Sequence, residues 1–160
     1  MTATFLPARR RFLVLSGLGL LAGCSTTTVL TPTPGAEDET QAALPMVNRL
    51  RQSKDLPALA LDMPARKAAA IQAIRMAKAD QMKHLIGLSD DFGARMKKSD
   101  VALPAAENIA SGQTSVDAVV QAWIDSPKHL ENMLGSYRGL GVAVARARDN
   151  RPYWAMVLSG

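Results

Sequence analysis

Cysteine, histidine and aromatic residues are scarce in this chain of 160 residues, which has one cysteine, two histidines and 4% aromatic residues. A single cysteine can form neither an internal disulfide nor a metal site built from several thiolates. Apolar residues nevertheless make up 48% of the chain, which is enough for a core. The length suits one domain. The composition therefore predicts one globular domain and excludes wholesale disorder.

The first 23 residues lack acidic side chains, and their only charges are three arginines at positions 9–11. The apolar run that follows, Phe12–Leu21, is much shorter than the ~20 residues that a membrane-spanning helix requires. A basic start, a short apolar run and small residues before a break are typical of a secretory signal peptide. The arginines fit a twin-arginine export signal as well as a plain basic start, so both export routes remain open.

This signal ends in Leu21-Ala22-Gly23-Cys24, which resembles a bacterial lipobox. The resemblance implies a diacylglycerol on Cys24, cleavage before it, and acylation of the new amino group. Two or three acyl chains would hold the protein at a membrane, because stable anchoring takes about two chains. Ser25 in place of an aspartate favours the outer membrane if the host is a diderm bacterium. The alternative is an accidental cysteine in an ordinary signal.

Cleavage before Cys24 changes the charge balance. The whole chain has 19 basic and 14 acidic side chains and a net charge of +5. Without the three arginines, 16 basic and 14 acidic side chains remain, a net charge of +2. A nucleic-acid-binding protein needs its basic side chains gathered on the folded part. We therefore expect no nucleic-acid partner, and we expect a monomer held together by packing alone.

Residues 1–23 are thus predicted to be a lipoprotein signal peptide, followed by a lipidated cysteine and a Thr/Pro-rich tether over residues 24–39. The folded domain is predicted over residues 40–160. Its expected elements are a helix over 40–53, a helix from Asp62 to His84 or Leu85, a loop over 86–106, a helix capped by Thr114, a helix from Ser126 to Leu134, and strands over 139–145 and 152–158. The predicted fold class is α+β, with helices on an antiparallel sheet.

Three side chains are candidates for chemistry: His84, Glu107 and His129. The histidines are the only two in the chain, and Glu107 is the only acid between residues 101 and 116. Imidazole nitrogens and a carboxylate oxygen can bind Zn²⁺ and leave a position open for water. Glu107 is also a candidate general base. Spacings of 23 and 22 residues do not bring these side chains together by themselves. His84 could equally lie at the C-terminus of a helix, Glu107 could accept backbone N–H groups in a turn, and His129 could be an ordinary exposed residue of a helix.

The motifs around these residues occur in a recognisable order. Glu107-Asn-Ile-Ala-x-Gly is followed by Trp123-x-x-Ser-Pro-x-His-x-x-Asn-x-Leu, then by Gly-x-Gly-Val-Ala and a terminal Tyr-Trp strand. This order resembles the bacterial branch of the CAP superfamily, which comprises cysteine-rich secretory proteins, antigen 5, pathogenesis-related proteins and SCP-like domains. The resemblance covers about residues 44–158.

The resemblance implies an α-β-α sandwich with a central antiparallel sheet. It also implies a cleft lined by His84, Glu107 and His129, which holds Zn²⁺ or another divalent cation in some members. A second glutamate has no counterpart here, and Lys128 stands where many bacterial members have glycine, which weakens the case for tight metal binding. We therefore expect a membrane-anchored envelope lipoprotein that binds a cation, a lipid or an envelope partner. A metal-assisted or acid–base hydrolase and a purely structural module are the alternatives.

Overall fold

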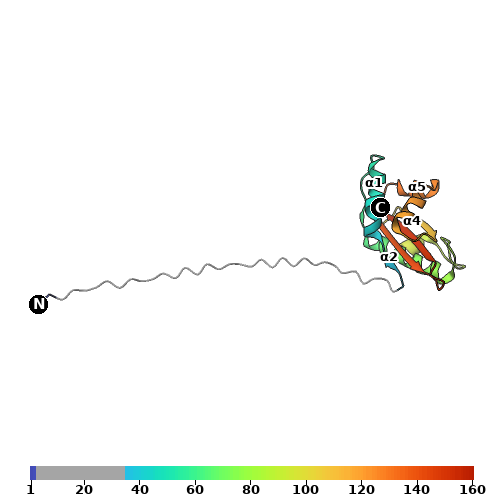
Figure 1. Cartoon of the computed structure of the whole chain (residues 1–160), viewed down its shortest axis with the longest axis horizontal. Coiled ribbons are helices and arrows are strands. Elements are labelled where there is room, and N and C mark those ends of the chain that lie inside the picture. Colours follow the sequence, from blue (N-terminus) through green and yellow to red (C-terminus); the bar gives the residue numbers. More distant parts are fainter. Residues whose placement is uncertain (3–34) are drawn as a thin grey trace. The chain divides into compact units, whose positions relative to one another are not determined.

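The computed structural model describes residues 1–2 and 35–160 (Figure 1). Most of the predicted signal peptide, the lipidation site Cys24 and most of the tether therefore lie outside the described residues. Within the described part of the chain, no helix is long and apolar enough to cross a membrane. Residues 35–160 lie within one compact unit that has its own core, so this part of the chain can be treated as a domain.

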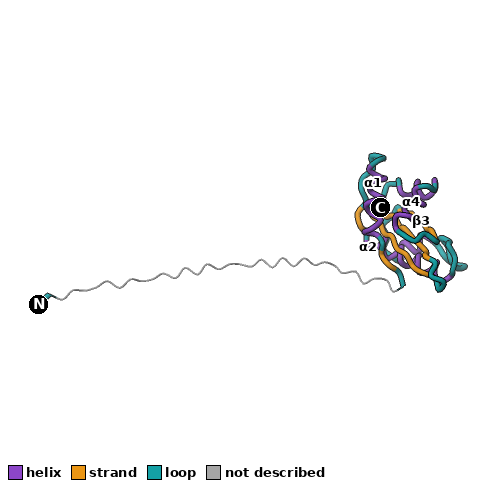
Figure 2. The backbone as a smooth tube through the Cα atoms, viewed as in Figure 1, coloured by secondary structure: helices purple, strands orange, loops and turns teal. Residues whose placement is uncertain are grey.

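One sheet of five strands forms the centre of the domain (Figure 2). Its strands are β1 (Glu37–Asp38), β2 (Ala60–Leu61), β3 (Ala105–Ser111), β4 (Gly139–Arg146) and β5 (Pro152–Ser159). The main order is β1-β4-β5-β3, with antiparallel neighbours, and β2 pairs parallel with β4. The predicted hairpin is confirmed, because β4 pairs with β5 around a turn in which Asn150 has a φ of 67°. The sheet begins at β1, a few residues before the predicted domain start.

Five helices cover this sheet. They are α1 (Thr40–Gln52), α2 (Met63–Ala79), α3 (Phe92–Lys98), α4 (Val116–Ile124) and α5 (Pro127–Met133). The predicted start of α2 is confirmed, since the Asp62 carboxylate accepts a hydrogen bond from the Ala65 N–H at 2.6 Å. The cap of α4 is Ser115 rather than Thr114, because Ser115 is the extended residue whose hydroxyl accepts from the Ala118 N–H.

Two predicted boundaries are wrong in ways that matter for the site. Helix α2 ends at Ala79, because Asp80 adopts a left-handed conformation with a φ of 51°. The Asp80 carboxylate also accepts a hydrogen bond from the buried Tyr153 hydroxyl at 2.6 Å. His84 is therefore in a loop and not at the end of a helix. The predicted loop over 86–106 contains α3 and the first residues of β3.

Side chains of the three long strands alternate between the two faces of the sheet, as the strand geometry requires. Those pointing toward α1, α4 and α5 are Ala106, Ala110, Leu140, Val142, Val144, Trp154, Met156 and Leu158. Those pointing toward α2 and α3 are Ile109, Ala143, Ala145, Tyr153, Ala155 and Val157. Each face thus has its own hydrophobic cluster, which confirms the α+β class and the α-β-α sandwich. On β3, the same alternation directs Glu107 and Asn108 toward opposite faces.

Candidate functional site

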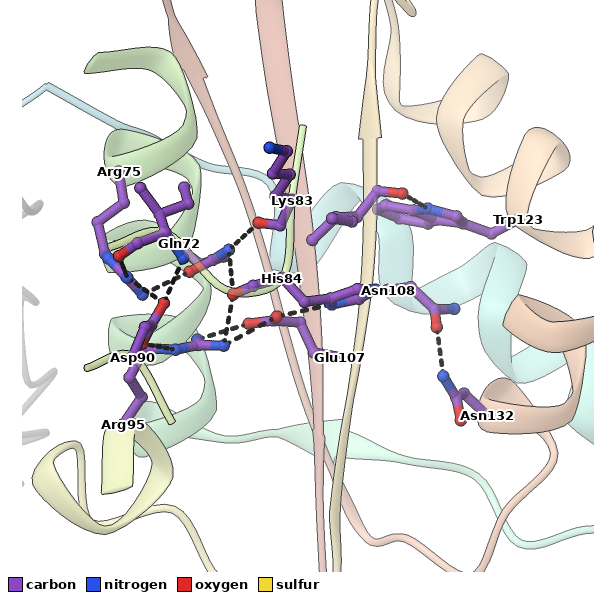
Figure 3. A network of polar contacts seen from close by, with 12 residues as sticks. Gln72, Arg75, Lys83, His84, Asp90, Arg95, Glu107, Asn108, Trp123 and Asn132 are labelled. Carbon is purple, nitrogen blue, oxygen red and sulfur yellow. Dashed lines mark hydrogen bonds and ion pairs between the residues drawn. The ribbon is translucent and has the colours of Figure 1, made fainter. Parts of the chain in front are cut away.

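Glu107 and His84 are in direct contact beside strand β3 (Figure 3). Glu107 Oε1 lies 2.9 Å from His84 Nδ1, and the Glu107 side chain is only 2% exposed, whereas that of His84 is 49% exposed. An ionised carboxylate can only accept hydrogen bonds, so this contact assigns a proton to Nδ1. Nε2 is then the imidazole nitrogen that Glu107 does not engage. The pair therefore orients a half-exposed imidazole.

Arg95 on α3 holds the Glu107 carboxylate in place. Its Nη1 donates to Oε2 at 2.8 Å and its Nη2 donates to Oε1 at 3.1 Å, a two-point contact that fixes both position and orientation. Arg95 is a site residue that the sequence does not reveal, because the sequence predicts a loop where the structure has α3. Asp91 is the residue in the sequence that could have indicated the start of this helix, because its carboxylate caps α3 by accepting a hydrogen bond from the Ala94 N–H at 2.6 Å.

A second acid and a second arginine position the loop that contains His84. Arg75 forms an ion pair with Asp90 and donates to the Ile86 carbonyl at 2.9 Å. Asp90 in turn accepts from the Ile86 N–H at 2.6 Å. Burial would raise the pKa of Asp90, but hydrogen bonds from Arg75 and Ile86 and the nearby charges of Arg75 and Arg95 hold it below its usual value. Asp90 therefore remains a carboxylate that can anchor the loop.

Asn108, whose side chain lies on the opposite face of β3 from Glu107, holds the main chain of His129 on α5. Asn108 is fully buried, donates to the His129 carbonyl oxygen at 3.0 Å, and accepts from Asn132 Nδ2 at 2.8 Å. Burial, and then the charge of His84, lowers the pKa of the His129 imidazole. The structure joins His84 to Glu107 by a direct contact, whereas His129 belongs to a separate element, α5, and its main chain contacts Asn108.

The three predicted metal ligands do not form a metal-binding group as arranged. Among residues 1–2 and 35–160, no three His, Cys, Asp or Glu side chains lie close enough to hold a metal ion. Arg95 occupies both oxygens of Glu107, and its positive charge competes for the lone pairs that Zn²⁺ would need. The residues do not fit a divalent cation in this arrangement. The buried carboxylate of Glu107, held by Arg95 and His84, is also poorly placed as a general base.

A pocket of about 170 Å³ opens next to this site, between α2 and α3. Its walls include Ile71, Arg75, Arg95 and Met96, and none of the three predicted cleft residues lines it. The pocket therefore lies on the Arg95 side of the network. A cleft shared by all three residues remains a prediction.

The lowered pKa of His129 predicts a loss of stability on acidification. The unfolded chain, in which the pKa of His129 is about 6.5, binds a proton at a higher pH than the folded chain does. The free energy of unfolding is therefore unaffected by this group above about pH 6.5, and it decreases as the pH falls from there toward the lower pKa of the folded state. We expect the melting temperature of the wild type to fall more between pH 7.5 and 5.5 than that of His129→Gln. Scanning calorimetry checks this, and parallel declines would contradict it.

Comparison with known proteins agrees with this architecture. Residues 44–158 match the model of the family described as CAP, the cysteine-rich secretory protein family. No curated protein sequence matches the chain. An outer surface protein of Borrelia burgdorferi is similar in structure, with a TM-score of 0.66 and 23% identity over 74% of this chain and 90% of that chain.

Two further solved structures are similar over 76% of this chain. An extracellular protein of Bacillus anthracis that contains an SCP domain has a TM-score of 0.66 and 25% identity, with 40% of its chain covered. A cysteine-rich secretory protein of Staphylococcus aureus has a TM-score of 0.56 and 18% identity, with 38% covered. The present chain thus spans well under half of these two proteins. The sandwich, the order of the motifs and the match over residues 44–158 together show that the chain belongs to the cysteine-rich secretory protein (CAP) family.

Proposed function

We propose that this CAP domain is an exported binding module, anchored to the cell envelope through acylated Cys24, that recognises a polar ligand at His84 and His129. The signal peptide and lipobox in the sequence support export and anchoring. The structural relatives from Borrelia burgdorferi and Bacillus anthracis are described as an outer surface protein and an extracellular protein. Both descriptions are consistent with an exported domain.

The observation that carries the binding role is the fixed, half-exposed imidazole of His84. Two side chains position it: Glu107 accepts from its Nδ1, and Arg95 holds Glu107 from the other side. A buried ion pair adds little net stability compared with well-packed apolar residues. The main consequence of the Arg95–Glu107 pair is therefore the orientation of His84 toward solvent.

The chemistry of this imidazole restricts the ligand. His84 Nε2 accepts a hydrogen bond from a hydroxyl when it is deprotonated, and it donates to an anionic oxygen when it is protonated. Lys128 is exposed next to His129 in the sequence and adds a positive charge. The engaged Glu107 disfavours a divalent cation. Among a cation, a lipid and an envelope partner, we therefore favour a phosphate or sugar group of a lipid or envelope component.

Histidine-resolved NMR of the chain beginning at Ser25 tests this proposal. The probes are glycerol 3-phosphate, soluble cell-wall disaccharide–peptides and Zn²⁺, each raised to about 10 mM, which is tenfold above the Kd of a weak ligand. We expect one of the first two probes to shift the His84 ring signals saturably, and Zn²⁺ to leave them unchanged. In Glu107→Gln, which keeps the shape of the side chain but loses its charge, we expect at least a roughly tenfold weaker response.

Arg146→Gln is the matched control, because Arg146 is exposed at the end of β4 and lies outside the network. It should bind as the wild type does. If neither imidazole responds to any of the three probes, the binding role is wrong and the structural module remains. A saturable Zn²⁺ response that requires both histidines would instead support the metal site.

A further inference from the structure

The loop between α2 and α3 exposes an unusual share of apolar surface. Met82, Leu85 and Leu88 have exposed fractions of 50%, 52% and 108%. These are three of the seven large apolar side chains that are exposed in the described part of the chain, and they lie within seven consecutive residues. Single exposed apolar residues are ordinary on a protein surface, but a cluster of them indicates a contact surface. We refer to Met82–Leu88 as the apolar loop.

The apolar loop is held in place rather than left free (Figure 3). Its main chain takes part in five hydrogen bonds with side chains: Gln72 donates to the Lys83 and His84 carbonyls at 2.8 and 3.2 Å, Arg75 to the Ile86 carbonyl at 2.9 Å, Arg95 to the His84 carbonyl at 3.1 Å, and the Ile86 N–H to Asp90 at 2.6 Å. A loop fixed through its backbone cannot readily turn its apolar side chains inward. The fold therefore presents these side chains to solvent.

Basic side chains flank the apolar loop in the sequence. Residues 75–98 contain six basic and three acidic side chains, a net charge of +3, whereas residues 25–160 as a whole have a net charge of +2. Arg75 and Arg95 are paired with buried acids, but Lys78, Lys83, Lys97 and Lys98 are exposed. Exposed apolar side chains among lysines are the combination that binds the interface of an anionic bilayer.

The N-terminal end of the domain is close to the same helix. A Cβ placed on Gly35 would lie 3.9 Å from the Ile74 Cγ1, so residue 35 lies beside the C-terminal half of α2. That half of α2 also carries Gln72 and Arg75, which hold the apolar loop. The eleven residues 24–34 span at most about 40 Å. An acyl chain on Cys24 would therefore keep the loop within reach of the bilayer.

We propose that the apolar loop is a second membrane contact, in which Met82, Leu85 and Leu88 enter the interface of an anionic bilayer and the flanking lysines contact its headgroups. This inference rests on the proposed function in one respect: the acylated Cys24 is what brings the domain to a bilayer. It also deepens the proposed function, because His84 lies within the loop and would be placed at the level of the lipid phosphates. The acyl chains on Cys24 would anchor the protein by themselves, so the contribution of the apolar loop would be to orient the domain at the bilayer.

Co-sedimentation with vesicles tests the inference directly. The chain beginning at Ser25, which has no acylated cysteine, is mixed with vesicles of phosphatidylglycerol and phosphatidylethanolamine, or of phosphatidylcholine alone. We expect binding to the anionic vesicles that weakens at high salt. The double variant Leu85→Gln/Leu88→Gln should lower the partition coefficient at least about tenfold, since burying one leucine corresponds to roughly that factor. Lys97→Gln/Lys98→Gln should weaken binding to anionic vesicles only.

Leu103→Gln is the matched control, because Leu103 is 71% exposed but lies outside the apolar loop. It should bind as the wild type does. The inference is overturned if the wild type does not bind anionic vesicles, if Leu85→Gln/Leu88→Gln binds unchanged, or if that variant instead converts a dimer to a monomer without vesicles. None of these outcomes changes the NMR response of His84 to soluble probes, so the binding role is tested independently. Membrane fractionation of the full-length Cys24→Ser variant tests the acyl anchor separately.

Discussion

Replacing Arg51 with methionine is expected to destabilise the domain by about 3–5 kcal/mol, a large fraction of the roughly 5–15 kcal/mol that stabilises a typical domain. Arg51 on α1 is only 1% exposed, and its guanidinium donates to main-chain carbonyls instead of to a carboxylate. The acceptors are the carbonyls of Pro57 and Met133 at 2.9 Å, Gly135 at 2.9 Å and Tyr137 at 3.5 Å. Methionine fills a similar volume but leaves these groups without their donor.

The same residue connects α1 to the segment between α5 and β4, which are more than 80 residues apart in sequence. Urea denaturation of the chain beginning at Ser25 measures the effect. Arg49→Met is the control, since Arg49 lies on the same helix but is exposed, and a change within about 0.5 kcal/mol is expected there. Equal stabilities of the two variants would show that the buried guanidinium does not connect these elements.

Replacing Gly141 with alanine is expected to cost about 3 kcal/mol and to lower the melting temperature by roughly 10 °C. Gly141 lies on β4 directly under α2, and an added Cβ would lie 2.2 Å from the Ala65 carbonyl carbon and 2.2 Å from the Arg66 nitrogen. Both are main-chain atoms, so no rotamer change can relieve the overlap. Helix α2 would have to move away from the sheet, and the loop that Gln72 and Arg75 hold would move with it.

Gly93→Ala is the matched control for this substitution. Gly93 lies in α3, where an added Cβ would lie 3.3 Å from the Asp91 Oδ1, a side-chain atom that can shift. Alanine is also favoured over glycine in helices by about 1 kcal/mol, so this variant should be neutral or more stable. Differential scanning calorimetry compares the two. If Gly141→Ala melts with the wild type, α2 does not pack against β4 at this distance.

Local signals predicted a large part of the fold. Asp62 followed by a proline predicted the start of α2, and the Asp149-Asn150 turn predicted the β4–β5 hairpin. Each of these features depends on side chains within a few residues of the backbone groups they satisfy, which is why sequence alone identifies them. The family resemblance also came from motifs that each occupy a short segment, in an order that the match over residues 44–158 confirms.

Other features depend on partners that are distant in sequence. The end of α2 at Asp80 accompanies a hydrogen bond from Tyr153, 73 residues away. Strand β3 was missed because Glu107 and Asn108 interrupt its apolar pattern, and both are buried only because α3, α5 and the His84 loop supply polar partners. Burial of polar side chains requires such partners, and local sequence does not reveal them.

The sequence by itself determined the family, the start of α2, the hairpin and the three residues worth examining. Only the tertiary structure decided how those residues are combined. Glu107 contacts Arg95 and His84 on one face of β3. Asn108 contacts the main chain of His129 on the other face, since neighbouring residues on a strand point in opposite directions. Spacings of 23 and 22 residues contain no such information, because contacts across a sheet depend on register and on which helices cover each face.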